Sequence, residues 1–153
     1  ASKATEDNIQ IRVESPEGLP LLEADRDKVK QVVLNLLSNA VKYNRPNGMV
    51  MLRAEASEKE LSLYIQDTGL GIPDDSLPHL FEKFFRVREH ESRVAGTGLG
   101  LSICKQIING HGGRIEVRSK IGVGTVFLVS LPRVSKTQQR VEEIENKQSK
   151  KKH

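Results

Sequence analysis

The 153-residue chain has little of several things on which particular protein classes depend. Its only cysteine is Cys104, which excludes an intramolecular disulfide and a cysteine-rich zinc module. Tryptophan is absent and only 4 Phe and 2 Tyr occur, so aromatic stacking platforms for nucleic-acid bases are disfavoured. No run approaches the roughly 20 apolar residues of a membrane span, and the N-terminus does not have the pattern of a signal peptide. We therefore expect a soluble domain.

The net charge of +4 comes from the C-terminal tail. Of the 24 basic and 20 acidic residues, seven and three lie between Arg133 and His153, which leaves 17 of each for residues 1–132. Hydrophobic residues also become scarce after Pro132. The sequence therefore predicts a domain over residues 1–132, a charged tail over residues 133–153 that is disordered or a frayed helix, and no nucleic-acid-binding face.

The spacing of apolar residues predicts an α+β fold. Alternation of apolar and polar residues indicates a half-buried strand over residues 8–14. Further strands are expected over residues 19–22, 49–56, 61–66, 114–119 and 125–131. Apolar residues three and four apart indicate helices from an N-cap at Asp25 to about Tyr43, over 76–85 and over 99–109. Because the strands follow one another in pairs, we expect a mixed sheet with the helices on one face.

Three glycine clusters are candidates for a phosphate or nucleotide site. They are Gly69-Leu70-Gly71, Gly96-Thr97-Gly98-Leu99-Gly100 and Gly122-Val123-Gly124. Glycine lets the backbone approach a ligand closely, and the middle cluster opens a helix, whose N-terminus attracts anions. A single cluster of this kind is more often a turn. The spacing also fits neither a P-loop nor a dinucleotide-binding fold, and the Asp67 loop lacks the ligand spacing of a calcium-binding loop.

A polar stripe on the first long helix is the second candidate feature. Gln31, Asn35, Asn39 and Lys42 are spaced by 4, 4 and 3 residues, which places them on one helix face. Asparagine is a poor helix former, so two in register need a reason. Amide oxygens can bind Mg²⁺ and a lysine can neutralise a phosphate. The alternative is a solvated helix face.

These features occur together in an order that resembles one family. Asn35-Leu-Leu-Ser-Asn39-Ala-Val-Lys42-Tyr43 resembles the N box of sensor histidine kinases, and Phe81-Glu-Lys-Phe84-Phe85-Arg86 resembles their F box. The three glycine clusters resemble the family's glycine boxes, and all five motifs lie in the family's order between residues 25 and 131. The resemblance implies the GHKL ATPase/kinase fold, a two-layer α/β sandwich with a mainly antiparallel sheet and three main helices on one face. It also implies ATP with Mg²⁺ as the ligand.

The resemblance assigns roles to individual residues. It implies that Asn35 binds Mg²⁺ and that Asn39, Lys42 and Arg86 face the phosphates, with Asn35, Lys42 and Arg86 as the catalytic set. It implies that Asp67 accepts from the adenine amino group, with four residues beside the nucleotide: Tyr43, Gly69, Gly71 and Thr125. Residues 86–97 would form a mobile lid with its hinge at Gly96, Gly98 and Gly100. These three glycines and Leu99 would also bind the nucleotide.

The function implied is donation of the γ-phosphoryl group of ATP to a histidine on a separate dimerisation domain. Related ATPases carry a water-activating glutamate where this chain has Gln31, which cannot act as a general base. The alternatives are an ATP-hydrolysing conformational switch and a degenerate nucleotide-binding module. The phosphoacceptor box is not found: His90-Glu91-Ser92-Arg93 lacks its proline, His111 reads as structural and Cys104 as core. We expect a monomeric cytoplasmic fragment of a larger, membrane-anchored or soluble kinase, with a response regulator downstream.

Overall fold

The computed structural model describes residues 7–16, 24–87, 100–133, 141 and 143–148. The elements in chain order are β1 (Gln10–Glu14), α2 (Arg26–Lys42), β2 (Met49–Ala56), β3 (Glu60–Asp67), the short 3₁₀ helix η1 (Leu77–His79), α3 (Gly100–Gly110), β4 (Arg114–Lys120) and β5 (Gly124–Pro132). None of the helices in these ranges has the length and apolar composition needed to cross a bilayer.

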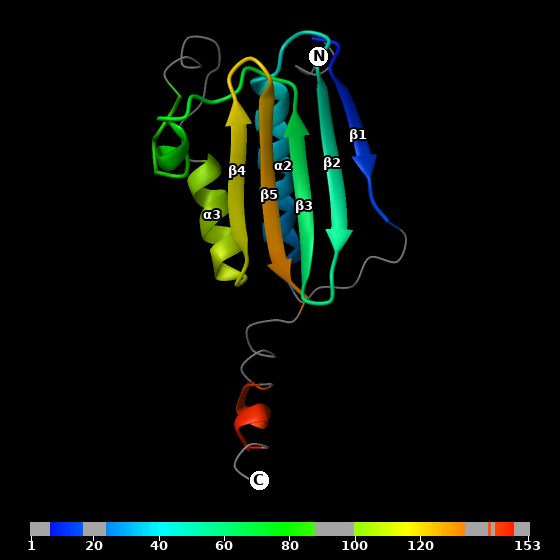
Figure 1. Cartoon of the computed structure of the whole chain (residues 1–153), viewed down its shortest axis with the longest axis vertical. Coiled ribbons are helices and arrows are strands. Elements are labelled where there is room, and N and C mark those ends of the chain that lie inside the picture. The colour runs from blue at the N-terminus through cyan, green and yellow to red at the C-terminus, as the bar shows by residue number, and fades with distance from the viewer. Residues whose placement is uncertain (1–6, 17–23, 88–99, 134–140, 142, 149–153) are drawn as a thin grey trace.

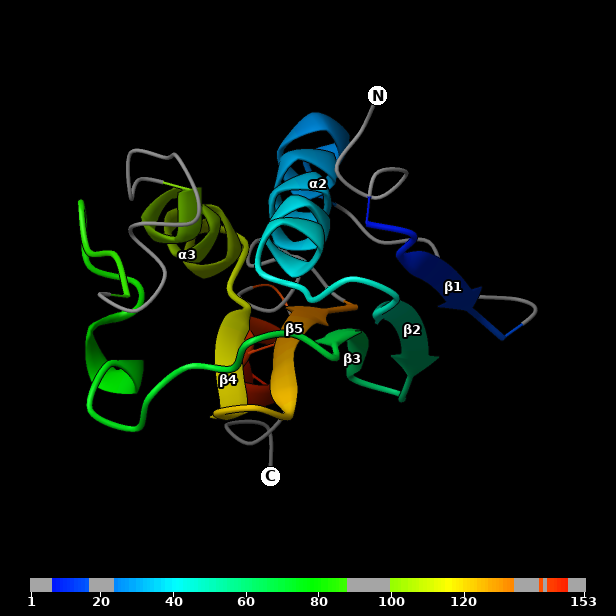
Figure 2. The same ribbon diagram turned by 90° about the horizontal axis from the view of Figure 1, so that it is seen from above.

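The five strands form one mixed sheet in the order β1-β2-β3-β5-β4. β1 runs parallel to β2, and the other three neighbouring pairs are antiparallel. Figures 1 and 2 show α2 and α3 lying side by side on the same face of this sheet. The predicted mixed, mainly antiparallel sheet with helices on one face is therefore confirmed.

Helix α2 begins where the sequence predicts. The Asp25 carboxylate accepts a hydrogen bond from the Lys28 backbone N–H at 3.1 Å, which satisfies one of the unpaired donors of the first turn. Val32, Leu36 and Ala40 are buried against the sheet, while the polar residues between them turn away from the core. Helix α2 therefore packs into the core with one face, and its other face is available for a binding site.

His111 connects the end of α3 to the start of α2. Its Nδ1 donates to the Ile107 carbonyl at 2.8 Å, and its Nε2 accepts from the Asp25 backbone N–H at 3.0 Å. Cys104 on the same helix is fully buried. The structural role predicted for His111 and the core position predicted for Cys104 are confirmed.

The segment after β3 differs from the prediction. The helix expected over residues 76–85 is instead the 3₁₀ turn η1, followed by further turns. The backbone hydrogen bonds of this segment join residues three apart in sequence. For example, the Glu82 N–H donates to the His79 carbonyl at 3.0 Å. Phe84 opposes an α-helix here, because its φ of 64° is left-handed. Pro78 does not, since it lies in the first turn, where the missing N–H would have no partner in a helix.

The remaining predicted elements agree closely or cannot be compared. The strand over 49–56 is confirmed residue for residue, and 61–66 is extended by one residue at each end. The strand predicted over 19–22 lies outside the described residues. In the tail, residue 141 and residues 143–148 have helical backbone and exposed side chains, and the division at Pro132 stays a prediction.

A matched pair of glycines separates backbone strain from packing. Gly71 and Gly122 have φ of 76° and 78°, but a Cβ at Gly71 would collide with the Lys120 carbonyl, whereas a Cβ at Gly122 would meet nothing. We expect Gly122→Ala to lower the free energy of unfolding by about 1 kcal/mol, which is the cost of a left-handed backbone, and Gly71→Ala to lower it by clearly more. Urea unfolding measures both. An equal loss of unfolding free energy in the two variants would show that the structure around Gly71 rearranges to accept a Cβ without further destabilisation.

Candidate nucleotide site

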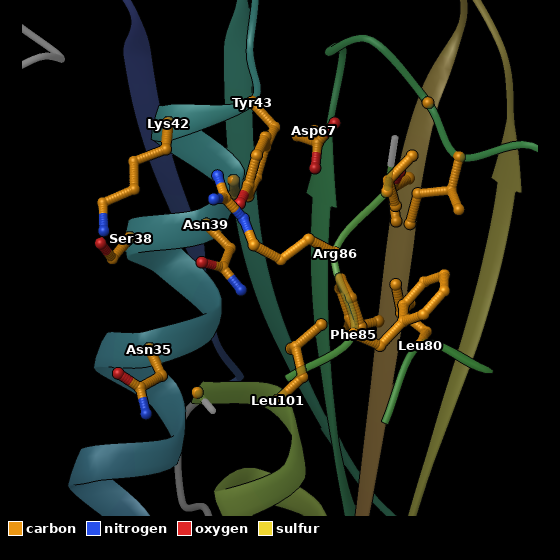
Figure 3. A pocket seen from close by; sticks show the side chains of 17 residues that line it. Asn35, Ser38, Asn39, Lys42, Tyr43, Asp67, Leu80, Phe85, Arg86 and Leu101 are labelled. Carbon is orange, nitrogen blue, oxygen red and sulfur yellow. The ribbon is translucent and has the colours of Figure 1, made fainter. Parts of the chain in front are cut away.

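A pocket of about 340 Å³ opens between α2, the ends of β3 and β5, and the segment that follows η1 (Figure 3). This volume is in the range typical of small-molecule sites. The pocket is lined by Asn35, Ser38, Asn39, Ala40, Lys42, Tyr43, Asp67, Gly71, Ile72, Leu80, Phe85, Arg86, Val87, Gly100, Leu101, Thr125 and Phe127.

The polar stripe of α2 forms one wall. Asn35, Asn39 and Lys42 line the pocket together with Ser38, and Figure 3 shows all four on the same helix. Gln31 is exposed and is not among the lining residues. The stripe is therefore a site wall from Asn35 onward, and Gln31 belongs to the solvated part of the helix.

Cys104 fixes the orientation of the Asn35 amide. The Asn35 Nδ2 donates to the Cys104 Sγ at 3.8 Å, and the thiol lies 4.0 Å from the Val32 carbonyl, to which it donates. Burial raises the pKa of the Cys104 thiol, so it stays protonated and can act as that donor. With its nitrogen engaged by sulfur, the Asn35 amide turns its oxygen away from α3. This oxygen is the atom that a hard cation requires.

Asp67 is a buried carboxylate at the end of a central strand. Its side chain points into the pocket in Figure 3, and its Oδ1 accepts from the Gly69 backbone N–H at 2.8 Å. Burial raises its pKa to about 6, and backbone hydrogen bonds from Gly69 and Thr125 oppose that shift. The carboxylate is thus held by backbone donors and can accept one more hydrogen bond from a ligand.

The glycines around Asp67 are required by close backbone packing. A Cβ at Gly69 would collide with the Tyr43 carbonyl, and one at Gly124 would collide with the Asp67 carbonyl. The Leu70 N–H donates to the Tyr43 carbonyl at 3.0 Å, and the Gly122 N–H donates to the Leu70 carbonyl at 3.0 Å. Three connections, from α2, β3 and β4, therefore meet at this end of the sheet. Gly100, by contrast, has open space around it.

The segment after η1 closes the opposite side of the pocket. Phe85 and the buried Leu80 and Val87 supply apolar surface, and Arg86 points from this segment across the pocket toward α2 (Figure 3). Arg86 thus brings a guanidinium into the pocket that Asn39 and Lys42 also line. The pocket is therefore lined by two cationic side chains, Lys42 and Arg86, which suits an anionic ligand.

Most of the predicted site residues come together in this single pocket. Those that line it are Asn35, Asn39, Lys42, Tyr43, Asp67, Gly71, Arg86, Gly100 and Thr125. Gly69 does not line the cavity but binds the Asp67 carboxylate. Gly96, Gly98, Leu99 and most of the predicted lid lie outside the described residues.

Sequence reasoning missed eight lining residues. They are Ser38, Ala40, Ile72, Leu80, Phe85, Val87, Leu101 and Phe127. Ser38 could have been found, because it lies three residues from Asn35 on the same helix face. The others are apolar or small, and periodicity alone cannot tell a pocket wall from the core beneath it.

Among the residues that the structure describes, no group of three or more His, Cys, Asp or Glu side chains could hold a metal ion. A divalent cation would therefore depend on the Asn35 oxygen and on oxygens that a ligand brings. Mg²⁺ is often bound in this way, through few protein ligands plus substrate phosphates.

The raised pKa of Asp67 has a testable effect on stability. The folded state binds the Asp67 proton more tightly than the unfolded state, whose ordinary pKa is 3.8. Stability from this group is full below about pH 4 and is lost as pH rises through about 6, by up to about 3 kcal/mol. Asp67→Asn should abolish this part of the pH dependence, measured by urea unfolding from pH 4 to 7.5. Parallel curves for the two proteins would contradict the assigned burial.

Comparison with known proteins supports the family assignment. The family described as histidine kinase-, DNA gyrase B- and HSP90-like ATPases matches residues 24–135. The sensor protein SrrB of Staphylococcus aureus is 44% identical over 110 residues, which are 71% of this chain and 19% of SrrB. The chain thus spans about a fifth of the length of such curated relatives.

Solved structures agree with this result. The catalytic domain of histidine kinase ThkA, in a nucleotide-free form, has a TM-score of 0.74 at 32% identity, covering 86% of this chain and 85% of that one. ThkA has also been solved in complex with the response regulator protein TrrA, with a TM-score of 0.69 at 30% identity, covering 86% and 36%. Full-length ShkA in complex with AMPPNP has a TM-score of 0.75 at 31% identity, covering 87% and 27%. The chain therefore belongs to the histidine kinase-, DNA gyrase B- and HSP90-like ATPase family, as a catalytic domain of the sensor histidine kinase type.

Proposed function

We propose that this domain binds Mg-ATP and donates the γ-phosphoryl group to a histidine on the dimerisation domain of a two-component sensor kinase. The observation that carries the proposal is the buried Asp67 carboxylate, which faces the asparagine-bearing side of α2 across one pocket. A carboxylate that can bind a purine base, and a wall of groups that can bind phosphate and a metal ion, together suit a nucleoside triphosphate. The AMPPNP complex of ShkA and the TrrA complex of ThkA support the same ligand class and a response regulator partner.

The Asp67 end of the pocket selects adenine. A carboxylate accepts a hydrogen bond from the exocyclic amino group of adenine, whereas guanine presents an oxo group at that position and would repel it. Ile72 and Phe127 provide apolar surface beside the carboxylate, which suits a flat aromatic base. Thr125 is held by the Ser119 hydroxyl at 2.7 Å and completes this end.

The opposite end receives the phosphates. Lys42 and Arg86 supply positive charge, and Asn39 supplies a hydrogen-bonding amide between them. Gly100 begins α3, so backbone N–H groups at the helix N-terminus are available to an anion. The Asn35 oxygen, held in place through Cys104, would ligate a Mg²⁺ ion that neutralises phosphate charge.

Transfer to histidine requires that the domain present the phosphate without activating water. The bond between the γ-phosphorus and its bridging oxygen breaks, and a bond to a histidine ring nitrogen forms. The ring proton is released and ADP leaves with the bridging oxygen. Gln31 is exposed, outside the pocket and not basic, which disfavours rapid hydrolysis. The acceptor histidine would lie on a separate domain, and the reaction would take place on the cytoplasmic side of the cell.

The isolated domain should bind adenine nucleotides and turn them over very slowly. Isothermal titration calorimetry should detect ADP and ATP, and Asp67→Asn should weaken ADP binding by at least about tenfold because the charge-assisted hydrogen bond is lost. A phosphate-release assay on the same preparation should give only slow turnover. Brisk hydrolysis would instead support an ATP-driven conformational switch, and unchanged ADP affinity in Asp67→Asn would remove Asp67 as the purine reader.

Asn35→Ala should separate metal binding from nucleotide binding. Loss of the amide oxygen should reduce the gain in ATP affinity that Mg²⁺ provides, while ADP binding in the presence of a chelator stays near the wild-type value. Calorimetry with and without Mg²⁺ measures both quantities. Gln31→Ala is the matched control, because it lies one turn away on the same helix but outside the pocket. An equal loss with and without Mg²⁺ would show that Asn35 supports the fold instead.

A further inference from the structure

Arg45 lies outside the pocket, in the connection between α2 and β2, and binds two other loops. Its Nη2 donates to the Gly69 carbonyl at 3.0 Å and to the Gly122 carbonyl at 2.6 Å. These partners are 24 and 77 residues away in sequence. Figure 1 shows the three connections involved at the same end of the sheet: the one between α2 and β2, the one after β3 and the turn between β4 and β5. One guanidinium thus links all three.

Gly69 is hydrogen-bonded through both its N–H and its carbonyl. Its N–H donates to the Asp67 carboxylate at 2.8 Å, while its carbonyl accepts from Arg45 at 3.0 Å. The two bonds lie on adjacent peptide planes that share the Gly69 Cα, so a shift of this residue away from Arg45 would also move the N–H that holds the carboxylate. The position of Asp67 Oδ1, and with it the direction of the other oxygen, therefore depends on a contact that lies outside the pocket.

Arg45 is itself well fixed by its neighbours. Its backbone N–H donates to the Asn44 Oδ1 at 2.9 Å, and its carbonyl accepts from the Gly48 N–H at 3.1 Å. Asn44 is 6% exposed and anchors the connection through its Nδ2, which donates to the Met49 carbonyl at 3.0 Å. The planar guanidinium is suited to bridging two carbonyls, and a lysine ammonium would reproduce the charge without the same directionality.

We propose that Arg45 is a positioning residue for purine recognition. By binding the Gly69 and Gly122 carbonyls, it fixes the position of the loop whose Gly69 N–H holds the Asp67 carboxylate. The carboxylate is thereby oriented toward the 6-amino group of adenine. The inference rests on the proposed function of the pocket as an adenine nucleotide site. Arg45 touches no ligand in this scheme and acts only through Gly69 and the turn between β4 and β5.

The test compares ADP with IDP, which carries an oxo group in place of the 6-amino group. The wild-type domain should prefer ADP. Arg45→Ala should weaken ADP binding by about three- to tenfold while IDP binding changes little, so that the preference shrinks. Arg45→Lys should restore part of it. Because the Arg45 side chain is exposed and outside the core, these variants should fold. The matched control is Arg53→Ala, an exposed arginine that packs over Tyr64 on β3.

A second measurement needs no nucleotide. Hydrogen exchange in the empty domain should become faster at the Leu70 and Gly122 amides in Arg45→Ala, and should be unchanged in Arg53→Ala. A wild-type domain that binds neither nucleotide would overturn the proposed function and this inference with it. A wild-type domain that prefers ADP, together with an Arg45→Ala domain that keeps the full preference, would overturn this inference alone. Equal weakening of ADP and IDP would do the same, because it would show a merely structural role.

Discussion

The rest of the site depends on one buried carboxylate. Asp67 ends the central strand β3, where its backbone pairs with Val50 on one side and Thr125 on the other. Burying a charge without a cation is costly unless hydrogen-bond donors replace water. The donors here are backbone N–H groups, which can reach the carboxylate only if the chain turns tightly around it. This requirement explains why the connections at this end of the sheet are rich in glycine and packed backbone against backbone.

The two ends of the pocket are built on different principles. At the Asp67 end, strand ends and short loops are joined by backbone hydrogen bonds, so the geometry is set by main-chain atoms. At the other end, the polar groups are side chains on α2 and on the segment after η1, of which Lys42 and Arg86 are long. Under the proposed function, main-chain donors would hold a flat base in one position, and the Lys42 and Arg86 side chains would follow a phosphate chain that moves during transfer.

Helix α2 connects the site to the core. Val32, Leu36 and Ala40 hold it on the sheet, and the asparagines one position before Leu36 and Ala40 line the cavity. Because the helix is anchored by packing, it tolerates residues with low helix propensity on its pocket side. The contact between Asn35 and Cys104 is a second connection between core and site, because a buried side chain of α3 orients a polar group of the pocket.

The sequence by itself determined where the long helices, the paired strands and the polar stripe lie. The spacing of apolar residues and the position of glycines at turns are local properties of the chain. The sequence could not predict the 3₁₀ turns after β3, where the left-handed backbone of Phe84 interrupts an apolar pattern that is typical of a helix. Nor could it identify the apolar pocket wall, since Ile72 and Phe127 have the same sequence signal as core residues. Only the tertiary structure decided that Arg45, Gly69 and Gly122 meet, because that contact closes loops distant in sequence and no local pattern encodes which carbonyls a guanidinium will reach.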